Sequence, residues 1–270
     1  MNHHIDLITL GVTDPDRARE FYERGLGGVV RDGEDALTIS LGGSSSALAL
    51  RQWEAVARDA GVAPDSSGFR AFTLSYIVES AEEVDLVVAR AERHGGRISK
   101  PAKNAVWGYS AYVTDPGGHL WKVASTKRRP LLGRTSPADG NGRAVQPREV
   151  PITIGVADMK RSRRFYEDAV GLAVKKAFGS RFVMFEGRDG TSDLGMYKRE
   201  ALADDAAVRP DGSGFHGFSI TAVLESPESV EALVHAAQRA GATVVRPPAD
   251  GRGCFADLDG NLWQVACRER

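Results

Sequence analysis

The sequence is short of the residues that mark several common classes of protein. Its two cysteines, Cys254 and Cys267, form no Cys-x-x-Cys motif, so we expect neither a disulfide framework nor a zinc finger. The 35 basic and 36 acidic side chains give a formal net charge of -1, whereas proteins that bind nucleic acid usually carry a basic excess or stripe. No apolar run approaches the length that spans a bilayer, and the first residues lack the regions of a signal peptide. These absences predict a cytoplasmic protein that binds neither nucleic acid nor membrane.

What is present is the composition of a folded protein. Apolar residues make up 42% of the 270 residues and charged residues 26%, a balance typical of globular chains and not of disordered ones. A chain of this length is too long for one ordinary domain and suits two.

An internal repeat is the strongest signal in the chain. The segments Leu10–Asp14 and Ile154–Asp158 resemble each other, and each is followed by a Phe-Tyr-Glu run at the same spacing. Further along, Pro64–Phe69 matches Pro210–Phe215 at an offset of 146 residues (64 to 210). Such self-similarity indicates a duplicated unit. We therefore predict a first domain over 1–126, a Pro- and Gly-rich linker over 127–149 and a second domain over 150–270.

Each copy has the pattern of two successive β-α-β-β-β modules. Apolar residues alternate with others through residues 7–12, as in a half-buried strand, and Asp14 then begins a helix as its N-cap. A strand near residues 72–78 restarts the pattern, and Ser80 stands at the N-cap of the next helix. Four modules of this kind predict the α+β fold class.

The motifs resemble those of the vicinal oxygen chelate superfamily, which includes glyoxalase I, bleomycin-resistance proteins and extradiol dioxygenases. The resemblance rests on the openings ITLGVTDPDRAREFYE and ITIGVADMKRSRRFYE and on the closing segments DPGGHLWKVA and DLDGNLWQVA. It implies tandem glyoxalase-like domains in which paired βαβββ modules form a cup-shaped curved sheet. It also implies that the two domains pack as a pseudo-dimer within one chain, and it leaves a homodimer of chains open.

Catalytic members of that superfamily hold a divalent metal through about four His or Glu ligands, a donor set that suits Zn, Ni, Fe or Mn. At the first-strand ligand position, the resemblance places Leu7 and Pro151, and at the last-strand position it places Lys122 and Gln264. None of these is a histidine or a carboxylate. We therefore expect no metal and no other cofactor.

Strand alternation predicts which side chains face the two cups. Thr9 and Thr153 lie between apolar residues that pack beneath helices, so the threonines face the interior of a cup. Lys122 and Gln264 face it too, since the preceding tryptophans turn the other way. The Lys122 ammonium could bind a ligand carboxylate or phosphate, or extend into solvent.

Aromatic side chains and one histidine complete the set of candidates. Trp107, Tyr109 and Tyr76 could stack on a planar ligand or fill the core between sheet and helices. His216 begins a strand that borders a cup. The candidate ligand-binding residues are thus Thr9, Tyr76, Trp107, Tyr109, Lys122, Thr153, His216 and Gln264.

Three functions are compatible with these residues. The first is metal-free binding or sequestration of an aromatic or hydrophobic compound, an anionic one included, such as an antibiotic or a metabolite. The second is a lyase, isomerase or dioxygenase that uses an atypical metal site, or metal-free acid/base chemistry by Lys122, Tyr76 or Tyr109. The third is a regulatory protein without activity that interacts with another protein. The missing ligands favour the first, with copy one holding the working pocket around Lys122 and a small organic molecule as its partner.

Overall fold

The computed structural model describes residues 3–130 and 145–268, which form four βαβββ modules in sequence order. Copy one contains modules one and two, and copy two contains modules three and four. Module one comprises β1 (Leu7–Val12), α1 (Pro15–Glu20) with the π-helical turn η1 (Phe21–Gly25), β2 (Val29–Asp32), β3 (Leu37–Ser40) and β4 (Ala47–Gln52). Module two comprises β6 (Phe72–Ile77), α3 (Ala81–Arg93), β7 (Arg97–Ala105), β8 (Gly108–Thr114) and β9 (Leu120–Ser125).

Copy two repeats this order. Module three comprises β10 (Ile152–Val156), α4 (Met159–Arg164) with the π-helical turn η2 (Phe165–Ala169), β11 (Val174–Phe178), β12 (Phe182–Phe185) and β13 (Leu194–Lys198). Module four comprises β15 (Phe218–Leu224), α6 (Pro227–Arg239), β16 (Thr243–Ala249), β17 (Arg252–Ala256) and β18 (Leu262–Cys267). Between the modules of each copy lie a short helix and a short strand, which are α2 (Trp53–Asp59) with β5 (Ser66–Gly68) and α5 (Arg199–Ala206) with β14 (Gly212–Gly214).

The helices begin where the sequence places their caps. The Asp14 carboxylate accepts a hydrogen bond from the Arg17 amide at 3.0 Å, and the Ser80 hydroxyl accepts one from the Glu83 amide at 3.2 Å. Each cap satisfies an amide that the first helical turn leaves without a backbone partner.

The modules assemble into two curved sheets of eight strands, and each sheet combines both copies. The first sheet joins modules one and four in the order β16-β17-β18-β15-β1-β4-β3-β2. The second sheet joins modules three and two in the order β11-β12-β13-β10-β6-β9-β8-β7. Antiparallel pairs β1–β15 and β10–β6 connect the modules at the centre of each sheet. The predicted α+β class with paired βαβββ modules is confirmed, but each cup belongs to both copies and not to one.

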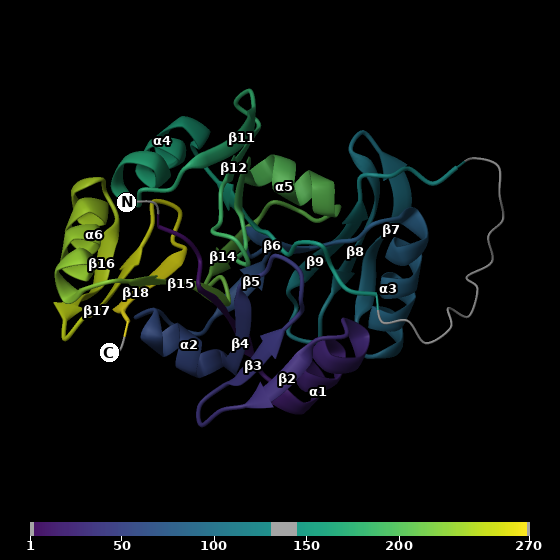
Figure 1. Cartoon of the computed structure of the whole chain (residues 1–270), viewed down its shortest axis with the longest axis horizontal. Coiled ribbons are helices and arrows are strands. Elements are labelled where there is room, and N and C mark those ends of the chain that lie inside the picture. The colour runs from purple at the N-terminus through teal and green to yellow at the C-terminus, as the bar shows by residue number, and fades with distance from the viewer. Residues whose placement is uncertain (1–2, 131–144, 269–270) are drawn as a thin grey trace.

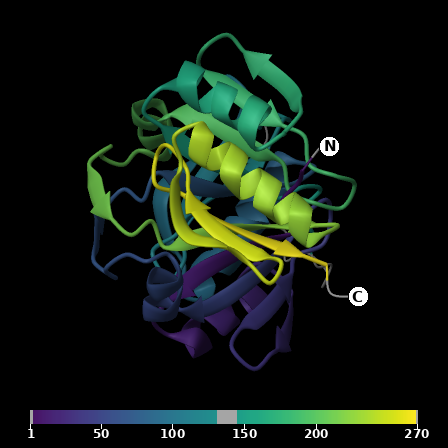
Figure 2. The same cartoon turned by 90° about the vertical axis from the view of Figure 1, so that its left-hand side faces the viewer.

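Four helices cover the outer faces of the sheets. Figure 1 shows α1, α3, α4 and α6 at the periphery, and Figure 2 shows α6 lying across β16–β18. Within copy one η1 packs on α3, and within copy two η2 packs on α6. The copies are thus joined through their strands and each copy internally through its helices. None of the described helices is long and apolar enough to cross a membrane.

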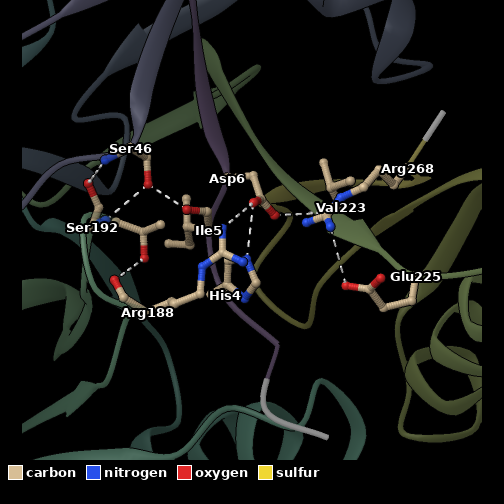
Figure 3. A network of polar contacts seen from close by, with 10 residues as sticks. His4, Ile5, Asp6, Ser46, Arg188, Ser192, Val223, Glu225 and Arg268 are labelled. Atoms are coloured by element: carbon tan, nitrogen blue, oxygen red, sulfur yellow. Dashed lines mark hydrogen bonds and ion pairs between the residues drawn. The ribbon is translucent and has the colours of Figure 1, made fainter. Parts of the chain in front are cut away.

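Matched residues of the two copies meet where the copies are related by the pseudo-twofold axis. The Ser46 amide donates to the Ser192 hydroxyl at 3.1 Å, and the Ser192 amide donates to the Ser46 hydroxyl at 3.0 Å (Figure 3). The hydroxyls then donate to the carbonyls of Ile5 and Val150. Because each amide and each hydroxyl of this buried serine pair has a partner, the pair fixes the register of the two copies.

Candidate functional site

The concave face of each sheet is occupied by a helix from the chain itself. Helix α2 packs Trp53 and Val56 against Phe215, Cys254 and Leu262 in the first sheet. Helix α5 packs on the second sheet in the same manner. Figure 1 shows α2 between α6 and α1, and α5 between β12 and α3. The cups are therefore partly filled, and a ligand must bind beside these helices or displace them.

The first cup is filled mainly by Trp53. Its ring lies against Gly11 and Gly217, where an added Cβ would come within 3.0 Å and 2.5 Å of ring atoms. Its indole nitrogen donates to the Pro64 carbonyl at 2.6 Å, and its ring makes an edge contact with Phe215 at 4.9 Å. The glycines are needed here because any side chain at those positions would collide with the indole.

The second cup contains a polar cluster around Asp205 of α5. Lys122 donates to the Asp205 carboxylate at 2.5 Å, and the Tyr112 hydroxyl donates to the same oxygen at 2.6 Å. Lys100 lies 3.7 Å from the other carboxylate oxygen and donates to the Asp205 backbone carbonyl. Burial by itself would raise the pKa of Asp205, but Lys122, Tyr112 and Lys100 lower it overall. The cluster is therefore an ionised carboxylate held by two ammonium groups and a phenol.

Beside this cluster, the second cup opens into a cleft of about 740 Å³. Its walls are the ribbon β5–β14, the ends of β7, β8 and β9, and the chain just after α5. Apolar surface comes from Phe69 and Leu120, and polar surface from hydroxyls and from arginines. A cleft of this size is in the range that holds small organic ligands.

Three arginines line the cleft, against one carboxylate. Arg70 is half-buried, donates to the Gly117 carbonyl at 2.8 Å and lies 4.5 Å above the Trp53 ring. Burial lowers its pKa, and the nearby Asp115 opposes that effect. Arg209 is exposed and donates to Asp211 at 2.9 Å, while Arg97 makes no side-chain hydrogen bond or ion pair within the described residues. The excess of positive charge favours an anion.

The two halves of the molecule differ at the first residue of the helix that packs in each cup. Trp53 begins α2, and its counterpart at the 146-residue offset is Arg199, which begins α5. The Arg199 guanidinium donates to the carbonyls of Phe69, Pro210 and Gly212, and so supports the wall of the cleft. A guanidinium with carbonyl partners stays at the wall, where an indole would cover the concave surface.

The structure places four of the predicted site residues on concave faces. Thr9 and Gln264 lie in the first cup, and Thr153 and Lys122 lie in the second. They do not form one site, because the two cups belong to different sheets. Lys122 is bonded to Asp205 and does not extend freely into solvent.

The predicted aromatic residues lie elsewhere. Tyr76 is buried on the helix side of the second sheet, where its hydroxyl shares its one proton between the carbonyls of Leu26 and Val145, each 2.9 Å away. Tyr109 also lies on the helix side and donates to Asp85 of α3 at 2.9 Å. The alternative in which both tyrosines fill the core therefore describes them better than stacking on a ligand. Trp107 is 65% exposed at the β7–β8 turn and contacts Phe178 at 4.9 Å.

His216 lies just before β15, mostly buried and hydrogen-bonded to the Asn261 side chain at 3.0 Å. Burial lowers its pKa, so the neutral imidazole is favoured. His216 is the counterpart of Arg70 at the 146-residue offset. This correspondence was not predicted from the sequence. Arg70, Arg97, Arg209 and Asp205 were also missed, although the repeated Pro64–Phe69 motif pointed to the ribbon that carries the cleft.

The donor set does not fit the divalent metal of the catalytic relatives. Leu7 and Gln264 offer one amide in the first cup, and the second cup presents a lysine at the position of Gln264. The Pro151 carbonyl accepts from the Ser75 amide at 2.9 Å, so it is already engaged. No group of three or more His, Cys, Asp or Glu side chains able to hold a metal occurs in the described parts of the chain.

Comparison with known proteins agrees with this architecture. The family model for the glyoxalase/bleomycin resistance protein/dioxygenase superfamily matches residues 4–123 and 150–265. The crystal structure of glyoxalase I from Zea mays is similar with a TM-score of 0.64 at 16% identity, covering 98% of this chain and 92% of that one. A putative dioxygenase from Bacillus subtilis has a TM-score of 0.62 at 15% identity, covering 100% and 87%. None of the curated proteins compared with the sequence matches it. At such identities, the structural likeness concerns the fold alone.

Proposed function

Since the chain belongs to the glyoxalase/bleomycin resistance protein/dioxygenase superfamily, we propose that it binds a small organic anion with an apolar or aromatic body, without a metal. The resemblance to that superfamily implies cups that enclose ligands. The site is the cleft beside α5, and the observation that carries the proposal is its composition. Phe69 and Leu120 provide apolar surface, and Arg70, Arg97 and Arg209 provide charge.

The arginines have different roles in this proposal. Arg70 is fixed between the Trp53 ring and the Gly117 carbonyl, so it offers a charge whose position is set before a ligand arrives. Arg97 and Arg209 lie at the exposed edge, where they attract an anion and can close on it. A guanidinium suits carboxylate, sulfonate and phosphate groups because it can donate two parallel hydrogen bonds.

Fluorescence titration with anilinonaphthalene sulfonate tests the proposal, with uncharged N-phenylnaphthylamine as the companion probe. The double variant Arg97→Gln, Arg209→Gln should bind the sulfonate about tenfold more weakly, which is ~1.4 kcal/mol and is within reach of two partly exposed charge pairs. The uncharged probe should bind both proteins alike. Affinity for the sulfonate should also fall as salt is added, since exposed charges are screened.

Arg93→Gln is the matched control, because Arg93 is an exposed arginine of α3 on the outer face. It should leave both titrations unchanged. Equal losses for the two probes, or an equal loss in the control, would show that the cleft arginines do not select an anion.

A further inference from the structure

The Asp205 carboxylate in the second cup has the environment of a bound ligand. All three side chains that hold it belong to module two, whereas Asp205 follows module three, so the contacts join separate parts of the chain. The ammonium groups of Lys100 and Lys122 lie 5.5 Å and 5.6 Å from the centre of the Tyr112 ring. Two cations and a phenol that converge on one carboxylate constitute a complete carboxylate-binding site.

The matched position in the first cup has a different arrangement. The counterpart of Asp205 is Asp59 (59 to 205), which pairs with Arg51 of the adjacent β4 at 2.5 Å. At the sheet positions of Lys122 and Tyr112, the first cup has Gln264 and Cys254. The carboxylate thus recurs in both helices, but the lysine–phenol receptor is present in the second cup alone.

Helix α5 is held in the cup by a limited set of contacts. It has eight residues, of which Leu202, Ala203 and Ala206 are buried. It ends at Ala207 in the left-handed backbone region with φ of 56°, where α2 is followed by Gly61 with φ of 65°. A non-glycine residue in this region is strained, so the end of α5 carries a backbone strain that the end of α2 does not.

We propose that Lys100, Lys122 and Tyr112 form a binding site for a small carboxylate, and that Asp205 occupies this site as an internal ligand until an external carboxylate displaces it. Displacement would move the end of α5, and Val208 and Arg209 just beyond it line the cleft. The site is distinct from the cleft arginines, so the proposal stands whether or not the cleft itself binds an anion.

The first experiment removes the internal carboxylate and supplies an external one. Asp205→Ala removes the carboxylate group beside the lysines, and Asp59→Ala is the matched control in α2. Thermal unfolding is followed in acetate, with acetamide and equimolar chloride as reference solutes. We expect acetate to raise the melting temperature of Asp205→Ala, with roughly tenfold tighter apparent binding than to the wild-type chain or to Asp59→Ala. Adding Lys122→Met should abolish the response.

Asp205→Asn, which keeps the side-chain shape, serves as a second variant if Asp205→Ala folds poorly. If acetate raises the melting temperature of neither variant, the proposal is overturned. It is also overturned if a variant is unfolded in chloride and acetate does not restore its folding. An equal response in Asp59→Ala overturns it too, because the effect would then not depend on the lysine–phenol receptor.

The second experiment tests displacement in the wild-type chain. Hydrogen exchange is measured with and without saturating benzoate, and the amides of α2 serve as the internal reference. Faster exchange over residues 199–206, with no change over residues 53–59, is the expected result. Unchanged exchange in α5 would show that Asp205 is a permanent structural partner of the lysines.

Discussion

The substitution Ala207→Gly should stabilise the protein, although it removes a side chain. Ala207 has φ of 56°, a left-handed conformation that glycine adopts freely. A Cβ in that region costs ~1–2 kcal/mol, so its removal should stabilise the folded state by that amount. The greater freedom of glycine in the unfolded chain offsets ~0.4–1 kcal/mol of this stabilisation. The Ala207 methyl is exposed, so its removal loses little burial. The net stabilisation should be about 0.5–1 kcal/mol.

The reverse substitution at the matched position, Gly61→Ala, should be destabilising. It introduces the same backbone strain at φ of 65°, and the new Cβ would lie 3.0 Å from a methyl carbon of Val245, which would have to move. Chemical denaturation gives the free energies of unfolding, and calorimetry gives melting temperatures. For a chain of this size ~1 kcal/mol corresponds to about 2–4 °C.

Ala71→Gly provides an internal comparison. Ala71 also has a positive φ, of 57°, where copy two has Gly217, but its methyl is buried against α5. It should therefore gain less than Ala207→Gly. If Ala207→Gly lowers stability, or if Gly61→Ala is neutral, backbone strain is not what distinguishes the ends of the two helices.

Three further predictions concern assembly, pH and metal content. Fragments 1–126 and 150–270 should each fail to form a folded monomer, because both sheets need strands from both copies. Mixing the two fragments should restore one cooperative melting transition. A monomeric fragment that melts like the full chain would contradict this prediction. His119→Asn should destabilise the protein most at neutral pH and less as the pH falls through about 4. Burial raises the pKa of Asp115 and His119 lowers it, and the net change is a decrease, whereas the pKa of Asp257, beside Asn261, is raised. A carboxyl group with a lowered pKa contributes stability that is lost on acidification. Protein purified without a His-tag and dialysed should hold well under one equivalent of Zn, Ni, Fe or Mn per chain by elemental analysis. A stoichiometric metal would instead favour the alternative function, a lyase, isomerase or dioxygenase with an atypical metal site.

The modules could be predicted from the sequence because local signals agree with the final fold. Alternation over residues 7–12 places Ile8 and Leu10 under the outer helices, and the structure buries both. The N-cap residues Asp14 and Ser80 form the hydrogen bonds that their positions predict. Such features depend on neighbours a few residues away, so they are visible in one sequence.

The pairing of modules could not be predicted in the same way. The four modules have similar patterns, so nothing local says that β1 pairs with β15 instead of β6. Helices α2 and α5 were missed too, since they are only seven and eight residues long. Helices of this length depend on tertiary packing more than on propensity.

The tyrosines show how one residue of register decides a side chain's role. Tyr76 shares the alternation of Phe72 and Leu74, and all three lie in the helix-side core. On β8, Tyr112 is opposite Lys122, so it shares the concave face, while Tyr109 lies three residues earlier on the other face. The strand pairing, which is not visible in the sequence, places Tyr112 on the concave face and Tyr109 in the core.

The duplication explains why one chain can contain a filled cup and an open one. When two identical modules pair in a homodimer, every substitution appears in both cups. In a duplicated chain, position 53 can hold a tryptophan that fills the first cup while position 199 holds an arginine that supports a cleft in the second. The same freedom puts Gln264 and Cys254 in one cup and Lys122 and Tyr112 in the other. Because the sheets interlock the copies, the filled cup contributes packing to the whole molecule, and the second cup can keep a strained residue at Ala207 and polar groups around Asp205.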